Sequence, residues 1–386
     1  MAIPIIYNLR NLRLRLAATI MTALGIALTV SIALFIMALL SGLNRAFVRT
    51  GSPENVLVIR KGSQSELSSY IGRELMQVIR FLPGIARDSR GEPQVSGEMT
   101  VVIVLPRKDG SGEVNVTVRG MTRTGPELRH SVRLLQGRWF EAGRREVVVS
   151  QSIDQRFAGA QVGDDLEFGK GKWTVVGIFD GGGTAFDSEI WGDVNQMSAD
   201  FDRDGYSSVL LKAENAVAAE GLKNRVNDDQ RLKLEGILEA DYYAQQTSSG
   251  APIQFVGTVV AVLMAIGSCF AAMNTMYASV AYRMREIATL RVLGFGRLSI
   301  LVCFVMESLI LAILGAAIGV LMMLPLNGLT TGTSNMVTFA EVVFSLQFTP
   351  GVILAAFVFA ILMGLIGGVA PAWHGARQNI LSALRD

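Results

Sequence analysis

The residue types that most often perform catalysis are sparse in this chain. It has 386 residues but only two histidines, His130 and His374, and two cysteines, Cys269 and Cys303. A hydrolytic triad needs a histidine beside its nucleophile, and a zinc site takes several histidine or cysteine ligands. Both cysteines lie in long apolar runs, where we expect them to be small packing residues. The sequence therefore predicts no catalytic centre and no bound metal or cofactor in this chain.

Phosphate-binding motifs are also missing. The sequence contains no Gly-x4-Gly-Lys-Ser/Thr motif, so it carries no loop of the type that holds ATP in P-loop proteins. A glycine run at 181–183, followed by Asp187 and Glu189, is the arrangement of an anion nest or a metal loop, but we interpret it as a flexible turn. Residues 182–200 receive no functional assignment.

A basic amphipathic segment lies between two long apolar runs. Residues 283–297 read Arg-Met-Arg-Glu-Ile-Ala-Thr-Leu-Arg-Val-Leu-Gly-Phe-Gly-Arg. The pattern predicts a short helix that ends at Gly294. We interpret this segment as a docking helix; the alternative is a positively charged loop that only fixes the topology of the chain in a membrane.

The apolar runs are long enough to cross a membrane. Half of the residues are hydrophobic, and four runs exceed the roughly 20 residues that span a hydrocarbon core about 30 Å thick. The first run is longer than the apolar region of a signal peptide, which has about 7 to 15 residues. The predicted transmembrane helices are 16–43, 253–282, 298–326 and 350–373.

Arginines indicate the orientation of these helices. The segments 1–15, 283–297 and 374–386 carry arginines, whereas the loop 327–349 carries none. Basic residues near span ends stay on the cytoplasmic side. We therefore expect a cytoplasmic amphipathic N-terminal segment, a cytoplasmic coupling segment and a cytoplasmic tail, with 327–349 and 44–252 outside.

The region 44–252 has the composition of a water-soluble domain that can bury its own core. Runs rich in β-branched residues alternate with helical patterns, and strand signals are densest at 137–179. The predicted fold class is an α-helical membrane protein with four transmembrane helices and a large α+β extracytoplasmic domain containing a β-rich subdomain. Predicted strands are 55–60, 99–105, 113–119, 146–149, 173–179 and 206–211, and predicted helices are 66–81 and 216–227.

The first two apolar runs are longer than a membrane requires. As straight helices at about 1.5 Å per residue they would measure roughly 42 to 45 Å. Both runs border the external domain directly, so we interpret their outer ends as a stalk that joins that domain to the bilayer.

Polar and small residues within the apolar runs indicate helix contacts. An ionisable group in hydrocarbon is costly, so we expect Glu307 to hydrogen-bond between helices near the cytoplasmic boundary; a proton relay is the alternative. Asn274 is interpreted as a second interhelical hydrogen bonder. Small residues four apart predict close packing, within one chain or between two, at Ala23 and Ala27, Gly315 and Gly319, and Gly364 and Gly368.

Several motifs together carry a resemblance to a known family. They are the 283–294 sequence, the closing residues 371–377 with 381–385, and the order of one span, a large external domain and three further spans. In the external region the motifs are 137–140, 146–149, 162–164 and 173–177. With these features the chain resembles the FtsX-like ABC transporter permeases of the MacB and LolC/LolE type.

The resemblance implies a mechanism and partners. It implies a homodimer or pseudo-symmetric dimer of permeases in the bacterial cytoplasmic (inner) membrane, surrounded by membrane lipids. It also implies two copies of a separate ABC ATPase, which binds the permeases and holds ATP and Mg. Motion of the ATPase would pass through the stalk to the periplasm, a process called mechanotransmission. Polar contacts to the ATPase are implied for Arg283, Arg285, Glu286 and Arg291, with Leu290 and Leu293 in its groove and Gly294 ending the helix.

The expected function is ATP-driven export or extraction of a lipid, lipoprotein, peptide or small molecule, with a periplasmic adaptor or an outer-membrane protein as a further partner. The alternative is a transmembrane signalling scaffold that activates an external protein such as a cell-wall hydrolase. In either case we expect a non-catalytic subunit and no nucleic-acid partner.

Overall fold

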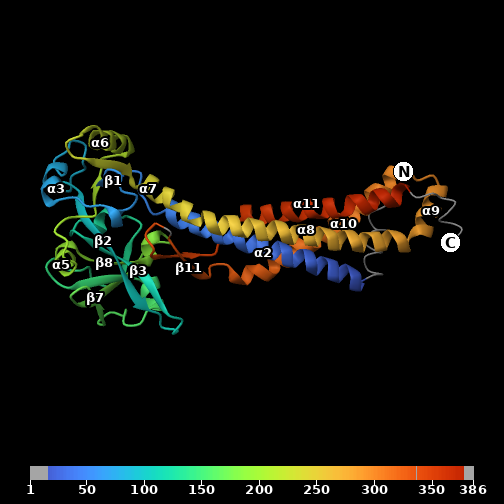
Figure 1. The fold of residues 1–386 in the computed structure, drawn as a ribbon, viewed down its shortest axis with the longest axis horizontal. Helices are drawn as coiled ribbons and strands as arrows, with labels where there is room; N and C mark the ends of the chain where they lie inside the picture. Colours follow the sequence, from blue (N-terminus) through green and yellow to red (C-terminus); the bar gives the residue numbers. More distant parts are fainter. Residues whose placement is uncertain (1–15, 336, 378–386) are drawn as a thin grey trace. The chain divides into compact units, whose positions relative to one another are not determined.

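The computed structural model describes residues 16–335 and 337–377 (Figure 1). The amphipathic segment expected at 1–15 and the closing motif at 381–385 lie outside these residues. The chain forms two compact units. The helical unit comprises the described parts of Met1–Ser41, Pro252–Leu329 and Leu346–Asp386, and the external unit comprises Gly42–Ala251 and Thr330–Ser345.

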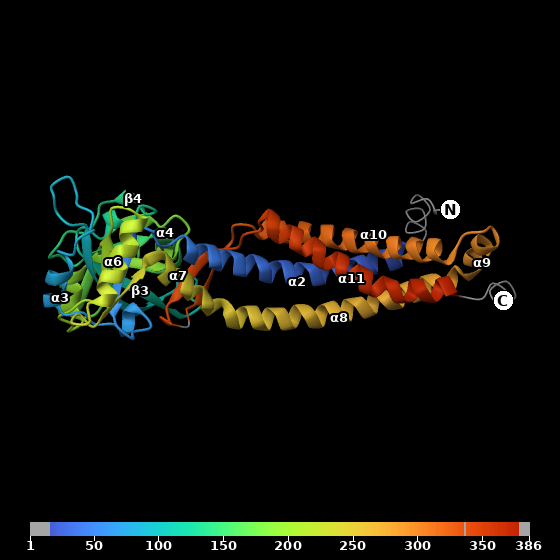
Figure 2. The same ribbon diagram turned by 90° about the horizontal axis from the view of Figure 1, so that it is seen from above.

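Four long helices are apolar enough, and long enough, to cross a membrane. They are α2 (Leu16–Val48), α8 (Ala251–Tyr282), α10 (Arg297–Met323) and α11 (Pro350–Arg377). The short helix α9 (Met284–Val292) joins α8 to α10, and a 3-10 turn, η5 (Leu324–Leu326), follows α10. In both views α10 and α11 lie side by side (Figures 1 and 2).

Small residues allow these helices to approach closely. A Cβ atom added to Gly319 of α10 would lie 2.7 Å from the backbone oxygen of Ala27 in α2. One added to Gly364 of α11 would lie 2.6 Å from the Cβ of Ala312 in α10. The small-residue faces at these positions are thus occupied within a single chain, which was one of the two interpretations of the sequence.

The contacts of α8 are sparser than those of its neighbours. Hydroxyl groups link it to α2, at 3.2 Å between Thr22 and Thr275 and at 3.1 Å between Thr29 and Ser268. Yet only 11% of its most apolar stretch is buried, against 50% for α2. A long apolar face of α8 is therefore left uncovered by the helical unit.

A ten-stranded mixed sheet forms the centre of the external unit. The strand order is β10-β1-β9-β2-β3-β8-β5-β7-β4, and β6 pairs with β7. The strands are β1 (Asn55–Arg60), β2 (Val95–Pro106), β3 (Glu113–Met121), β4 (Arg133–Gly137), β5 (Glu146–Ser150), β6 (Asp165–Phe168), β7 (Gly171–Asp180), β8 (Glu189–Asp193), β9 (Ser208–Lys212) and β10 (Leu234–Leu238).

Short helices surround this sheet. They are α3 (Arg73–Ile79), α4 (Gln151–Arg156), α5 (Val194–Asp200), α6 (Ala216–Asp228) and α7 (Glu239–Gln246), with 3-10 turns η1 (Glu66–Ser68), η2 (Pro126–Leu128), η3 (Ala185–Ser188) and η4 (Thr247–Gly250). The unit therefore mixes helices and strands, as the sequence predicts.

Two hydrophobic cores cover different parts of the sheet. One lies among β2, β3, β5, β6, β7 and β8 and includes Trp173, which has no exposed surface. The other joins β1, β9 and β10 to α3 and α6. The strands of 137–179 belong to the first core, which runs from Met99 to Met197, so the β-rich part is wider than predicted. The antiparallel pairing of β2 with β9 continues the sheet from one core to the other.

The helix predicted at 66–81 is interrupted. It consists of η1 and α3, with Gly72 at the N-cap of α3. Between them Ile71 pairs with Tyr206 as an isolated bridge, and each backbone N–H donates to the other's carbonyl, at 2.7 and 2.8 Å. These two hydrogen bonds replace the helical hydrogen bonds that Ile71 would otherwise make, because each residue has a single backbone N–H donor.

The connection between α10 and α11 is part of the external unit. It contains two paired strands, β11 (Thr330–Ser334) and β12 (Glu341–Ser345). Glu341 accepts hydrogen bonds from Arg107 at 2.7 Å and from Arg156 at 2.6 Å. The sequence indicates only a short loop here, whereas the structure shows a hairpin held to the domain by part-buried ion pairs.

Candidate functional site

A glycine fixes the end of the coupling helix α9. Gly294 has a φ of +94°, a left-handed conformation that glycine adopts without steric cost. The N–H of Gly294 donates to the carbonyl of Arg291 at 3.2 Å, and that of Phe295 donates to Leu290 at 3.1 Å. These two bonds form a Schellman motif, which defines where the helix stops.

The start of α9 is held by a buried ion pair. Arg283 is only 3% exposed, and its Nη1 donates to Oε2 of Glu307 in α10 at 2.9 Å. Its Nε donates to Glu286 at 3.3 Å, and its guanidinium lies 5.1 Å from the ring centre of Phe304. Glu307 itself is 5% exposed. Arg283 therefore positions α9 against α10, and its side chain is not displayed for direct contact with another protein, unlike the contact that the resemblance implies.

The last turn of α9 is tied to α11. Nη1 of Arg291 donates to the backbone oxygen of Ala376, in the last turn of α11, at 3.0 Å. A cation near the C-terminal carbonyls of a helix is electrostatically favourable. Together with Arg283, this bond attaches the coupling helix to two neighbouring helices.

The two sides of α9 differ in exposure. Ile287 and Ala288 face inward and are 5% and 2% exposed. The opposite side combines charged and apolar groups. Its exposed residues are Arg285, Glu286, Thr289, Val292 and Leu293, and Leu290 is half-buried. This mixed surface contains most of the residues predicted for docking, and adds Thr289 and Val292, which the sequence did not single out.

Asn274, the second polar residue predicted in the apolar runs, lies on the exposed side of α8. Its side chain has no hydrogen-bond partner among residues 16–335 and 337–377. Within one chain it therefore does not join two helices.

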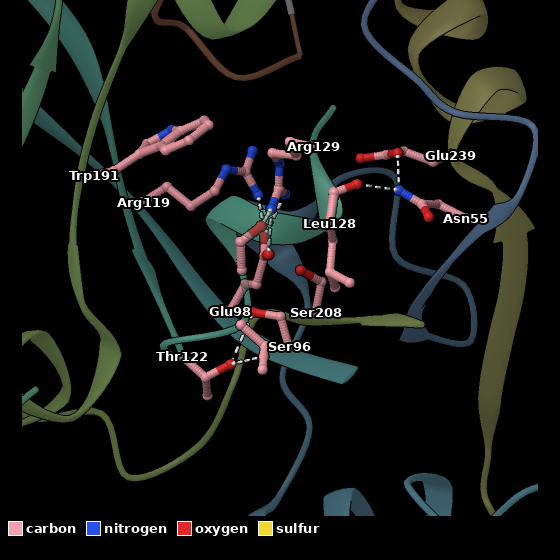
Figure 3. A network of polar contacts seen from close by, with 12 residues as sticks. Asn55, Ser96, Glu98, Arg119, Thr122, Leu128, Arg129, Trp191, Ser208 and Glu239 are labelled. Carbon is pink, nitrogen blue, oxygen red and sulfur yellow. Dashed lines mark hydrogen bonds and ion pairs between the residues drawn. The ribbon is translucent and has the colours of Figure 1, made fainter. Parts of the chain in front are cut away.

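A buried charge network occupies the external unit (Figure 3). Arg119 of β3 donates to Glu66 at 2.7 Å, to Glu98 at 2.9 Å and to Glu189 at 2.8 Å. Arg129 donates to both oxygens of Glu98, each at 2.7 Å. All five of these residues are at most 5% exposed. The network joins β2, β3, β8 and η1 through charge-assisted bonds, which are stronger than neutral ones.

Burial and pairing shift the carboxyl groups of this network in opposite directions. Burial alone would raise the pKa of Glu98, but Arg129 and Arg119 outweigh it and hold that pKa below its usual value. Glu239 of α7 accepts from the N–H of Ser52 at 3.1 Å and from Asn55 at 2.8 Å. Burial raises the pKa of Glu239, with Arg129 only partly opposing it.

Protein donors bind the carboxylates of this network. Its carboxylates accept hydrogen bonds from arginines, hydroxyls or amides, and the described residues contain no cluster of groups suited to hold a metal ion. This network was not predicted from the sequence. The available signal was the presence of Glu98 and Arg119 beside β-branched runs that otherwise read as fully buried strands.

Comparisons with known proteins agree with this architecture. Residues 19–229 match the model of the MacB-like periplasmic core domain, and residues 258–380 match the FtsX-like permease C-terminal model. The macrolide export ATP-binding/permease protein MacB of Rhodopseudomonas palustris is 25% identical over 328 residues, covering 78% of this chain and 48% of that protein. The chain thus spans about half the length of this relative.

Two further similarities concern YknZ proteins. The uncharacterized ABC transporter permease YknZ of Bacillus subtilis is 26% identical over 294 residues, covering 71% of this chain and 70% of that protein. The crystal structure of the extracellular domain of YknZ from Gram-positive bacteria aligns with 47% of this chain and 99% of that domain, at 16% identity and a TM-score of 0.36. The two family models cover most of the external region and most of the helical region, so the chain belongs to the ABC transporter permeases that combine a MacB-like periplasmic core domain with an FtsX-like C-terminal region.

Proposed function

We propose that this chain is the membrane-spanning, non-catalytic subunit of an ABC transporter and that an ATPase on a separate chain drives it. The observation that carries the proposal is helix α9. One side of it is fixed to α10 and α11 through Arg283 and Arg291, and the other side exposes charged and apolar groups. Such a helix can lie in a groove of a partner, with apolar anchors and a polar rim.

The attachment of α9 gives force a path into the helical unit. A displacement of α9 acts on α10 through the pair of Arg283 with Glu307, and on α11 through the bond from Arg291. The external unit is connected to these helices through α2, α8 and both ends of the β11–β12 hairpin. We propose that ATP-driven motion reaches the periplasmic domain by these connections, in a dimer of permeases with two ATPase subunits.

The distribution of arginines along the sequence supports this assignment. We propose that α9 and both chain termini face the cytoplasm of the inner membrane, because arginines gather in these segments. The ATPase and its ATP and Mg would then meet α9, and the work would be done in the periplasm. The cargo classes are a lipid, lipoprotein, peptide or small molecule, delivered with a periplasmic adaptor or an outer-membrane partner.

The docking proposal is tested on the exposed side of α9. The full chain is purified from native membranes, and its ATP-hydrolysing partner is identified by mass spectrometry. The double variant Glu286→Arg with Leu293→Asp should then weaken ATPase binding at least tenfold, since loss of a central contact costs about 2 kcal/mol or more. ATP hydrolysis stimulated by the permease should fall in parallel.

A matched control places the same apolar-to-acidic change far from α9. Val217 on α6 is 83% exposed, so Val217→Asp should leave assembly and hydrolysis unchanged. Normal assembly and normal stimulation in the α9 double variant would refute docking at this surface.

A further inference from the structure

An apolar groove runs along α8 and α11 within the helical unit. Its volume is about 420 Å³, and its lining contains no charged side chain. Residues that line it are strongly exposed, including Phe270 at 63% and Ile366 at 66%. Val262 and Ile266 of α8, which also line it, are each 49% exposed. The groove is therefore open along its length to whatever surrounds the helices.

A second, shallow cavity with a different lining adjoins the groove at Ile366. This cavity measures about 770 Å³. It extends to the last turn of α11, where Trp373, His374 and Arg377 line it together with Tyr277 of α8. The combined feature has an apolar body and a basic, aromatic end.

The chemistry of that end indicates an anionic ligand. The guanidinium of Arg377 lies 4.2 Å from the ring centre of Trp373, and no acidic side chain pairs with it in the part of the chain that the structure describes. The rings of Tyr277 and His374 meet edge to face at 5.9 Å. Tryptophan and tyrosine favour the boundary between hydrocarbon and water, and basic pockets between transmembrane helices bind acidic headgroups.

We propose that this groove is a binding site for an anionic glycerophospholipid of the cytoplasmic leaflet. Its phosphate lies at Arg377 beside the Trp373 ring, and an acyl chain follows the apolar groove past Ile366 and Phe270. The lipid covers the exposed face of α8 and joins that helix to α11. The inference rests on the membrane insertion and orientation proposed above.

Tryptophan fluorescence provides a direct test. Of the four tryptophans in the sequence, Trp139, Trp173 and Trp191 lie in the external unit and Trp373 lies in the helical unit. The full chain is reconstituted in phosphatidylcholine bilayers that contain a small, fixed fraction of brominated phosphatidylglycerol or, separately, brominated phosphatidylcholine. Subtracting the signal of a Trp373→Phe variant isolates the quenching of Trp373 by bromine.

Brominated phosphatidylglycerol should quench Trp373 with an apparent affinity about fivefold higher than brominated phosphatidylcholine. This factor corresponds to the ~1 kcal/mol that one basic residue contributes to acidic-lipid attraction near a membrane surface. Arg377→Gln should abolish the preference, and Arg377→Lys, which keeps the charge, should retain most of it. Arg297→Gln removes an exposed charge that lines neither cavity and should leave the preference intact.

Two results would overturn the lipid site while leaving membrane insertion standing. Equal quenching by both lipids would show a face that contacts bulk lipid without selection. An equal loss of preference in Arg297→Gln and Arg377→Gln would show diffuse attraction by the whole basic surface. Quenching by neither lipid would contradict both the lipid site and the insertion of α11 in the membrane, unless a second copy of the chain covers this face. Crosslinking between copies would detect that arrangement, which would also overturn the lipid site.

Discussion

The buried pair of Arg283 and Glu307 permits a quantitative prediction about the attachment of the coupling helix. At 2.9 Å, and with an effective dielectric constant of about 20, the gross Coulomb attraction is roughly 6 kcal/mol. Much of it is offset by the cost of removing both charges from water. Deleting one partner leaves the other charge buried and uncompensated, which typically costs about 3 to 5 kcal/mol.

We expect Arg283→Met and Glu307→Gln each to lower the free energy of unfolding of the helical unit by about 3 kcal/mol. The lower end of the range applies to Glu307→Gln because Arg283 keeps its contact with Glu286 at 3.3 Å. The double variant should cost less than the sum of the two, by a coupling of about 2 kcal/mol, because it leaves no buried charge of the pair.

The assay is unfolding of the full chain in detergent micelles by titration with sodium dodecyl sulfate, analysed as a double-mutant cycle. Arg297→Met provides the matched control, since Arg297 is exposed and the change should cost less than about 0.5 kcal/mol. A cost for Arg283→Met equal to that of the control, or simple additivity in the double variant, would refute the claim that this pair holds α9 in place.

Three further predictions concern the rest of the chain. Burial raises the pKa of Glu239, so the folded protein binds a proton on this carboxyl more tightly than the unfolded chain does. Stability should therefore fall as the pH rises from the ordinary pKa of about 4.3 through the raised pKa of the folded state. Glu239→Gln should remove this fall, which is measured as the unfolding midpoint between pH 4 and 8. Glu98→Gln deprives Arg129 of its carboxylate and should lower the free energy of unfolding by about 3 to 5 kcal/mol, measured by urea unfolding followed by Trp fluorescence. A smaller decrease would contradict a large contribution of the network to stability. Gly319→Ala places a Cβ 2.7 Å from a backbone oxygen of α2 and should cost about 1 to 3 kcal/mol in detergent unfolding, whereas Gly267→Ala meets no atom within 4 Å and should be neutral or slightly stabilising.

The sequence predicts the helical unit better than the external one. A long apolar run indicates a buried or membrane-spanning helix, so composition alone locates α2, α8, α10 and α11. The end of α9 also follows from a local signal, since glycine is the residue that accepts the backbone conformation found at Gly294. By contrast, the pairing of Arg283 with Glu307 joins residues 24 positions apart in different helices, and no local pattern reveals it.

Strand β8 and the β11–β12 hairpin were not predicted from the sequence, because distant residues stabilise them. All five residues of β8 are buried, although Glu189 and Asp193 make the segment look like a polar loop. Burial of Glu189 is tolerated because Arg119, 70 residues earlier, donates to both of its oxygens. The β11–β12 hairpin was missed for a similar reason. Its partners, Arg107 and Arg156, lie far from it in sequence.

The position of Glu341 also sets an order of events during synthesis of the protein. Arg107 and Arg156 are made 234 and 185 residues before the carboxylate that pairs with both of them. At about 5 to 20 residues per second, a ribosome needs roughly 10 to 50 s to travel from Arg107 to Glu341. During that interval the sequences of α8 and α10 also leave the ribosome. Until the β11–β12 hairpin is synthesised, Arg107 and Arg156 of the nascent external domain therefore lack this carboxylate. During this delay the domain is incomplete and is open to binding by a chaperone or cleavage by a protease.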